Sequence, residues 1–151
     1  LAQGDTVCVV SGESIAVESA ILAPEGTVIA VEYNQQDRRT MEENAHQFGL
    51  NNIAIIDHVD DKSMEDLPVP TLAFLVASAS LEQEIACLLR RNPQMEFVVY
   101  TLDFCCAAAL PALFERYGIG ETEVIQIAVS KLTGKHTFQA EPAPWLISGR
   151  A

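Results

Sequence analysis

A short polar turn and a carboxylate about 20 residues further on have the spacing of a nucleotide-type ligand site. Ser11-Gly12-Glu13 follows one apolar run, and Glu32 ends the next. In such sites the backbone N–H groups of the turn face the ligand, and the carboxylate accepts hydrogen bonds from ribose hydroxyls. The spacing is typical of a dinucleotide or S-adenosylmethionine site. These turns usually contain two or three glycines, since glycine permits close approach of the backbone, but here Gly12 stands alone.

Other polar or aromatic side chains follow apolar runs and are candidates for the same site. Tyr33 has two interpretations, stacking beside an adenine or packing on the helix that follows it. Thr101 and Asp103 come after a later run, at the strand ends where ligands bind in open α/β sheets. Asp103 is also explained by capping of the next helix. His58 has a similar strand-end location, but a lone histidine in a loop is more often a surface residue than a catalytic one.

The charge distribution excludes one class of partner. The chain carries 9 basic and 21 acidic residues, for a net charge of −12. Such a surface repels a phosphate backbone, so we expect no nucleic-acid partner. Lys131, Lys135, His136 and Arg150 nevertheless gather near the C-terminus. They form either a solvated face or a local patch for an anionic ligand.

The elements that must position these residues alternate between strands and helices. The expected strands are short apolar runs, at residues 7–10, 27–31, 53–56, 72–76 and 97–100. The expected helices cover residues 14–22, 35–48, 80–91 and 104–117, and residues 57–70 form an acidic loop with at most one helical turn. Asn34 and Asp103 are the expected N-caps, Ser80 and Gln83 are expected to form a capping box, and Gly49 and Gly118 end their helices.

The end of the chain narrows the fold class. Two further strands, at residues 121–129 and 145–148, are joined by a loop at 133–144 with no helix between them. Such a connection makes an antiparallel pair. We therefore expect an α/β fold with a mostly parallel seven-stranded sheet, one antiparallel strand and helices on both faces. This is the plan of the Rossmann-like class I methyltransferases, and the terminal pair argues against a dehydrogenase.

Length and composition set the remaining limits. A chain of 151 residues is expected to form a single domain over residues 1–151. No apolar run reaches the ~18 residues of a membrane span, and residues 1–5 lead directly into a strand, so no membrane association and a cytoplasmic location are expected. The four cysteines lack zinc-ligand spacing and are expected to be buried thiols, and no metal site is predicted.

Segments near both ends of the chain resemble one methyltransferase family. They are residues 4–6, 14–20, 22–32, 42–45, 48–49, 121–131 and 144–150. These segments resemble the decarboxylating precorrin C5,15-methyltransferases of cobalamin biosynthesis, in particular their C-terminal, decarboxylase-type domain. The resemblance implies S-adenosylmethionine as methyl donor and a carboxylate-rich tetrapyrrole, a precorrin, as substrate. It also implies methylation of two ring carbons, loss of carbon dioxide from an acetate side chain, and a homo-oligomer such as a tetramer.

The chain departs from the family pattern at several strand ends. The turn at Ser11 is shorter than the family's Gly-x-Gly-x-Gly loop, His58-Val59 replaces a Gly-Asp pair, and residues 76–79 replace a glycine-rich segment. The family segment that precedes the first strand, which helps cover donor and substrate, is expected to be absent. Two hypotheses follow, an active methyltransferase with an unusual loop and a non-catalytic structural or scaffolding domain of a corrin-biosynthesis enzyme.

These observations predict binding residues but no specific catalytic residue. The residues predicted to bind the donor are Ser11, Gly12, Glu13, Glu32, Tyr33 and Ala77. The residues predicted to bind the substrate are Thr101, Lys131, Lys135 and His136.

Overall fold

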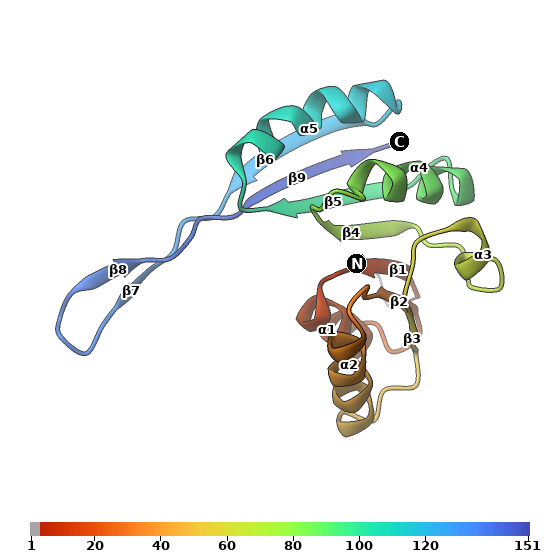
Figure 1. The fold of residues 1–151 in the computed structure, drawn as a ribbon, viewed down its shortest axis with the longest axis horizontal. Helices are drawn as coiled ribbons and strands as arrows, with labels where there is room; N and C mark the ends of the chain where they lie inside the picture. The colour runs from red at the N-terminus through yellow and green to blue at the C-terminus, as the bar shows by residue number, and fades with distance from the viewer. Residues whose placement is uncertain (1–3) are drawn as a thin grey trace.

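Five adjacent parallel strands, rich in apolar residues, form the larger part of the sheet. The computed structural model describes residues 4–151 and shows these strands with helices on either side (Figure 1). The strands are β1 (Thr6–Val10), β2 (Thr27–Val31), β3 (Ile53–Ile56), β4 (Leu72–Val76) and β5 (Glu96–Thr101). Each lies within one residue of its predicted position.

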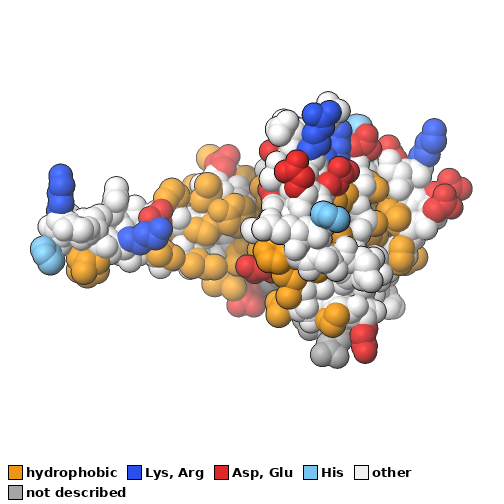
Figure 2. All heavy atoms as spheres, turned by 90° about the horizontal axis from the view of Figure 1, so that it is seen from below, with side chains coloured by type: hydrophobic (Ala, Val, Ile, Leu, Met, Phe, Trp, Pro, Cys, Tyr) orange, Lys and Arg blue, Asp and Glu red, His pale blue; other side chains and the backbone are white. Residues whose placement is uncertain are grey.

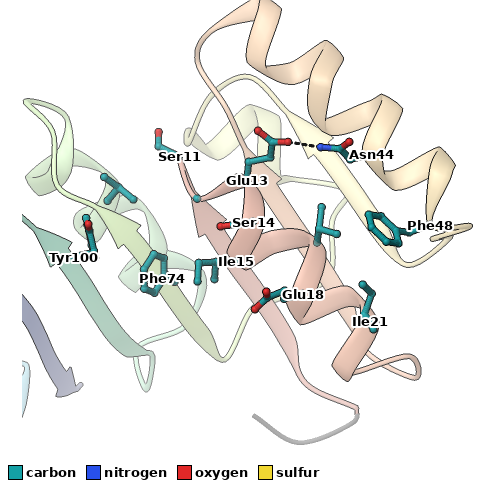
Figure 3. Close-up of a pocket in the computed structure, with 13 residues that line it drawn as sticks. Ser11, Glu13, Ser14, Ile15, Glu18, Ile21, Asn44, Phe48, Phe74 and Tyr100 are labelled. Atoms are coloured by element: carbon teal, nitrogen blue, oxygen red, sulfur yellow. Dashed lines mark hydrogen bonds between the residues drawn. The ribbon is translucent and has the colours of Figure 1, made fainter. Parts of the chain in front are cut away.

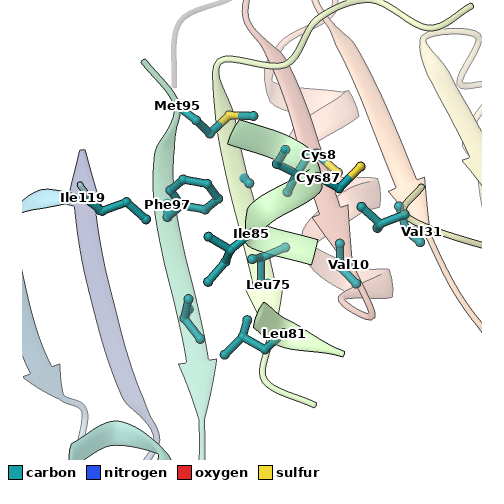
Figure 4. Close-up of a cluster of buried hydrophobic side chains, with 14 of the residues drawn as sticks. Cys8, Val10, Val31, Leu75, Leu81, Ile85, Cys87, Met95, Phe97 and Ile119 are labelled. Atoms are coloured by element: carbon teal, nitrogen blue, oxygen red, sulfur yellow. The ribbon is translucent and has the colours of Figure 1, made fainter. Parts of the chain in front are cut away.

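Alternate residues of β1 face two separate hydrophobic cores. Cys8 and Val10 point into the larger core, which the helices α4 (Leu81–Arg91) and α5 (Phe104–Arg116) cover (Figure 4). Val7 and Val9 point into a smaller core beneath the helices α1 (Glu13–Leu22) and α2 (Gln35–Gln47). This two-sided burial explains why the strands read as continuous apolar runs rather than alternating ones.

Helix ends follow the predicted caps with one exception. The side chain of Asn34 accepts hydrogen bonds from Gln36 N and Asp37 N at the start of α2, and Asp103 accepts from Cys105 N at the start of α5. Gly49 and Gly118 follow α2 and α5 with φ of 64° and 72°, a conformation that glycine adopts without strain. The expected helical turn in the acidic loop is α3 (Asp61–Met64).

The predicted capping box at α4 is wrong. Ser80 makes no side-chain cap, and its own N–H bonds to Ser78 Oγ at 3.1 Å. Gln83 points away from the helix start, because its Nε2 donates to Val59 O at 2.8 Å. The Gln83 side chain thus makes a tertiary contact with the loop after β3 and not the predicted contact at the start of α4.

The order of the strands confirms the expected fold class. The sheet runs β3-β2-β1-β4-β5-β9-β6, with β6 (Gly120–Gln126) at one edge and β9 (Trp145–Arg150) beside it. β9 is antiparallel to both β5 and β6, whereas the pairs among β1 to β5 are parallel. One reversed strand in a parallel seven-stranded sheet is the arrangement predicted from the chain end.

The connection between β6 and β9 differs from the expected loop. It contains a second, two-stranded sheet, in which β7 (Ser130–Leu132) pairs antiparallel with β8 (Phe138–Ala140). The predicted long strand over 121–129 therefore ends at Gln126, and the predicted loop over 133–144 contains β8. The hairpin projects from the body of the protein (Figure 1). Its strands are exposed, so no burial pattern marked them in the sequence.

Within residues 4–151, no helix has the length and apolar character needed to cross a membrane.

Candidate functional site

The turn after β1 lies where the strand order of the sheet reverses. β1 and β4 are neighbours, yet α1 follows β1 onto one face and α4 follows β4 onto the other. Ligands of open α/β folds bind at the carboxyl ends of the strands flanking such a point. Ser11 has a left-handed φ of 59°, and its N–H donates to Val31 O at 2.8 Å. This bond holds the turn against the end of β2, next to Glu32.

The N-terminus of α1 has no side-chain cap. Gly12 is its N-cap residue and no side chain accepts from the first-turn N–H groups in the described chain. The partial positive charge of this end is therefore available to an anion or a polar ligand. The Glu13 carboxylate does not cap this N-terminus, because it accepts a hydrogen bond of 2.5 Å from Asn44 Nδ2 on α2 (Figure 3).

A cleft of about 790 Å³ opens beside this turn. It extends along α1 from the ends of β4 and β5 to α2, and Figure 3 shows Phe74 and Tyr100 on one side of α1 with Asn44 and Phe48 on the other. Gly12 is packed into its wall. A Cβ at Gly12 would lie 3.0 Å from Val9 Cγ1 and 3.5 Å from Phe74, so the glycine is needed for packing as well as for any ligand.

Glu32 stands at the end of β2 with a partly exposed side chain. Its N–H continues the sheet by donating to Ile56 O at 3.0 Å, and its Oε1 accepts from Asn34 N at 3.3 Å. Arg38 Nη1 donates to the carbonyl of Glu32 at 2.8 Å and to that of Tyr33 at 3.0 Å. These contacts fix the backbone at the strand end.

Tyr33 reaches across the sheet end to α4. Its hydroxyl donates to Glu84 Oε2 at 2.5 Å, and its ring meets the ring of His58 edge-on at 5.8 Å. These side-chain contacts of Tyr33 are with α4 and with the loop after β3. The contact with Glu84 joins residues 51 positions apart, which no local pattern indicates.

Glu84 is a buried carboxyl group on the inner face of α4. Its side chain is fully buried, and within residues 4–151 its Oε1 has no hydrogen-bond partner. Burial raises the pKa of Glu84, and the hydrogen bond from Tyr33 opposes this only in part. Burial also raises the pKa of the neighbouring Cys8 thiol to about 12. Burial thus shifts both groups toward their neutral forms.

The raised pKa of Glu84 predicts a pH-dependent stability. The folded state holds the Glu84 proton more tightly than the unfolded state does, so protonation of Glu84 adds to the free energy of unfolding. This added stability is complete below the ordinary glutamate pKa, ~4.3, and is lost as pH rises through the raised pKa of the folded state. We expect Glu84→Gln, which is neutral at every pH, to remove this loss. Thermal unfolding of both proteins from pH 4 to 8 measures it. An equal fall in the unfolding temperature of the two proteins would contradict the assignment to Glu84.

Two further residues predicted for the site, Ala77 and Thr101, are near the cleft but form hydrogen bonds with the main chain. The N–H of Ala77 donates to Tyr100 O at 2.9 Å, which extends the pairing of β4 with β5. Thr101 is buried, and its Oγ1 accepts from Asp103 N at 3.0 Å at the start of α5. Ala77 and Thr101 thus do not line the cleft, although both are at the carboxyl edge.

The basic residues predicted to bind substrate lie on the projecting hairpin. Lys131 is on β7 and pairs with Glu141 at 3.4 Å, and Lys135 and His136 form the exposed turn. His136 has a left-handed φ of 60°. The structure does not bring these residues together with Glu32 or with the cleft of the same chain.

Several residues around the site were not predicted from the sequence as site residues. Asn44, Phe74 and Tyr100 line the cleft from α2, β4 and β5. Glu84 could have been recognised from the sequence as a buried carboxylate, since it lies three residues after Leu81 and four before Leu88 on the apolar face of α4. A carboxylate on a buried helix face indicates a specific partner.

Comparison with known proteins assigns the family. The family model described as a precorrin methyltransferase domain matches residues 7–144. The chain belongs to the precorrin methyltransferase domain family. No curated protein matches the chain.

Solved structures share the fold of this precorrin methyltransferase domain. The precorrin-6Y C5,15-methyltransferase of Geobacter metallireducens is 22% identical with a TM-score of 0.87, and covers 99% of this chain and 81% of its own. The precorrin-8W decarboxylase of Methanobacterium thermoautotrophicum is 16% identical with a TM-score of 0.78, and the match covers 97% of this chain and 81% of that one. The C-terminal domain of a Rhodobacter capsulatus precorrin-6Y C5,15-methyltransferase is 21% identical with a TM-score of 0.71, over 98% and 81%.

Proposed function

We propose that this domain binds S-adenosylmethionine at the carboxyl ends of β1 and β2 and methylates a ring carbon of a precorrin in cobalamin biosynthesis. The observation that carries the proposal is the hydrogen bond from Ser11 N to Val31 O. It holds the uncapped N-terminus of α1 beside Glu32 at the point where the strand order reverses. An N-terminus and a carboxylate side by side are the two elements that a nucleoside with an anionic tail requires.

The residues present fit such a donor. Glu32 would accept hydrogen bonds from the ribose hydroxyls, and the first-turn N–H groups of α1 would face the donor's carboxylate. Asn44 contributes by drawing the Glu13 carboxylate toward α2, away from that N-terminus. When bound, the donor supplies an activated methyl group on a sulfonium. Most of the rate of such a transfer comes from holding donor and acceptor in line, so few acid–base groups are needed.

The finer parts of the proposal follow from the family. The substrate is a precorrin, and methylation is accompanied by loss of carbon dioxide from an acetate side chain. Lys131, Lys135 and His136 are proposed to meet substrate carboxylates, and Tyr33, Ala77 and Thr101 to border the donor and substrate positions. We further propose a single cytoplasmic domain that functions as a homo-oligomer.

A second candidate function is a non-catalytic scaffolding domain. The observation that favours it is that the turn after β1 is already committed to the protein. The Ser11 N–H is bonded to Val31 O, and Gly12 packs against Val9 and Phe74. Fewer backbone N–H groups then remain for a donor than in a glycine-rich loop. Donor binding separates the two functions.

Calorimetric titration with S-adenosylmethionine and its demethylated product tests the proposal. We expect micromolar affinity for the wild-type chain. Glu32→Ala is expected to weaken binding by about 1–2 kcal/mol, roughly tenfold, because charge-assisted hydrogen bonds to the ribose are lost. Glu25→Ala is the matched control, since Glu25 is an exposed carboxylate in the turn before β2. Absence of heat at millimolar donor would refute the methyltransferase and favour the scaffold.

A further inference from the structure

Glu84 on α4 is the one fully buried acidic side chain among residues 4–151. Figure 2 shows other acidic side chains on the surface of the body, where water solvates their charge. Glu84 instead lies between Leu81 and Leu88 on the inner face of α4, and both leucines belong to the larger core. Burial of a carboxyl group is costly unless its oxygens are hydrogen-bonded. Glu84 therefore occupies a position that packing alone would fill with an apolar residue.

The contact of Glu84 with Tyr33 satisfies only one of the two carboxyl oxygens. Oε2 accepts from the Tyr33 hydroxyl, whereas Oε1 has no hydrogen-bond partner within residues 4–151. A buried polar atom without a partner loses its hydration and receives nothing in exchange. Two apolar side chains of the same shape would avoid this loss, because such a replacement of both partners is nearly neutral or stabilising. Stability therefore does not account for this pair.

The contact fixes the residue next to the carboxylate that we propose to bind ribose. Tyr33 directly follows Glu32, and its hydroxyl is held by α4, which covers the larger core. The backbone of the same two residues is held by Arg38 on α2, whose Nη1 donates to both of their carbonyls. The helices α2 and α4 cover opposite faces of the sheet. Residues 32–33 are thus held from both faces at the end of β2.

The loop after β3 is attached to α4 at the same place. Gln83, the neighbour of Glu84, donates from Nε2 to Val59 O at 2.8 Å. The ring of His58, in the same loop, meets the ring of Tyr33 edge-on at 5.8 Å. The segments that follow β2 and β3 therefore meet on one turn of α4. Ligands of open α/β sheets bind among such strand-end segments, so the relative positions of these segments set the geometry of the site.

We propose that Glu84 is a positioning residue of the donor site, which acts through the Tyr33 hydroxyl to hold the segment that carries Glu32. This inference rests on the proposed function, because it assigns the held carboxylate to the ribose of S-adenosylmethionine. Glu84 itself touches no donor. A binding group that is already held in place loses less conformational freedom when the ligand arrives, and this raises affinity.

Calorimetric titration of the full chain with S-adenosylmethionine tests this role in the double variant Tyr33→Phe/Glu84→Leu. The double variant removes both polar partners together, so neither is left unpaired in the core. We expect donor affinity to fall about threefold to tenfold, the effect of one hydrogen bond, while the midpoint of thermal unfolding stays unchanged or rises. A merely structural role would lower both quantities. Glu84→Gln keeps an acceptor for the Tyr33 hydroxyl and should bind the donor as the wild type does.

A second tyrosine–glutamate pair on the same helix provides the matched control. The Tyr117 hydroxyl donates to Glu82 Oε1 at 2.9 Å and joins α4 to the end of α5. Neither residue belongs to a segment that follows β2 or β3. The double variant Tyr117→Phe/Glu82→Leu should therefore leave donor affinity unchanged.

Hydrogen exchange of the Glu32 N–H gives a readout that needs no donor. This N–H donates to Ile56 O at 3.0 Å, and we expect it to exchange faster in Tyr33→Phe/Glu84→Leu than in the wild type, because the segment opens more often. A wild type that gives no heat with the donor would overturn the proposed function and this inference with it. A wild type that binds, beside a Tyr33→Phe/Glu84→Leu variant of equal affinity or equal Glu32 exchange, would overturn the positioning role alone.

Discussion

Replacement of Phe114 by alanine is expected to lower the free energy of unfolding by about 3–5 kcal/mol. Phe114 is fully buried on the inner face of α5, and its ring lies 6.3 Å from that of Phe97 on β5. Truncation leaves a cavity between the helix and the sheet that the surrounding side chains fill only in part. Since small domains have about 5–15 kcal/mol of stability, this loss is a large fraction of the total.

Urea-induced unfolding followed by circular dichroism measures this change. Phe48→Ala is the control, because Phe48 is 60% exposed at the end of α2 and its removal leaves no enclosed cavity. We expect the control to change the free energy by about 1 kcal/mol or less. If both variants lost the same stability, Phe114 would not be the packing centre between α5 and the sheet.

Replacement of Gly149 by alanine is expected to cost about 1–3 kcal/mol through overpacking. A Cβ at this position of β9 would lie 2.6 Å from Ile119 Cγ2, 3.0 Å from Phe114 Cδ2 and 3.1 Å from the carbonyl oxygen of Gly120. Ile119 and Phe114 are themselves buried, and the carbonyl belongs to the backbone of the neighbouring strand. None of these neighbours can move freely to make room.

Gly134→Ala provides the comparison for this second variant. Gly134 is in the turn of the hairpin, and a Cβ there would meet no atom within 4 Å. Thermal unfolding should show a clearly lowered midpoint for Gly149→Ala and a nearly unchanged one for Gly134→Ala. A tolerant Gly149 would mean that β9 and α5 pack less closely than the structure shows.

The fold was largely predictable because its signals are local. Strands buried on both faces appear as apolar runs, and side-chain caps such as Asn34 and Asp103 act within three residues of their own position. The terminal antiparallel pair followed from the absence of a helix between two strand signals. The β7–β8 hairpin escaped prediction because its residues are exposed, so burial imposed no pattern on them.

The candidate site was predictable only where it depends on backbone position. Ser11, Gly12 and Glu32 lie at the carboxyl edge because they follow strands, and the spacing alone indicated this. The partners of polar side chains were not predictable. Gln83 contacts the loop after β3 instead of capping α4, and the Tyr33 hydroxyl donates to Glu84 on α4.

The sequence by itself determined the alternation of strands and helices, the class of the sheet and the place of the turn opposite Glu32. Each depends on burial periodicity or on capping over a few residues. The tertiary structure alone decided that Asn44 holds Glu13 and that Tyr33 meets a buried Glu84, across 31 and 51 residues. It also placed Lys131, Lys135 and His136 on the projecting hairpin, away from the cleft. The physical reason is that strand order and register bring distant side chains together, and spacing along the chain does not encode that proximity.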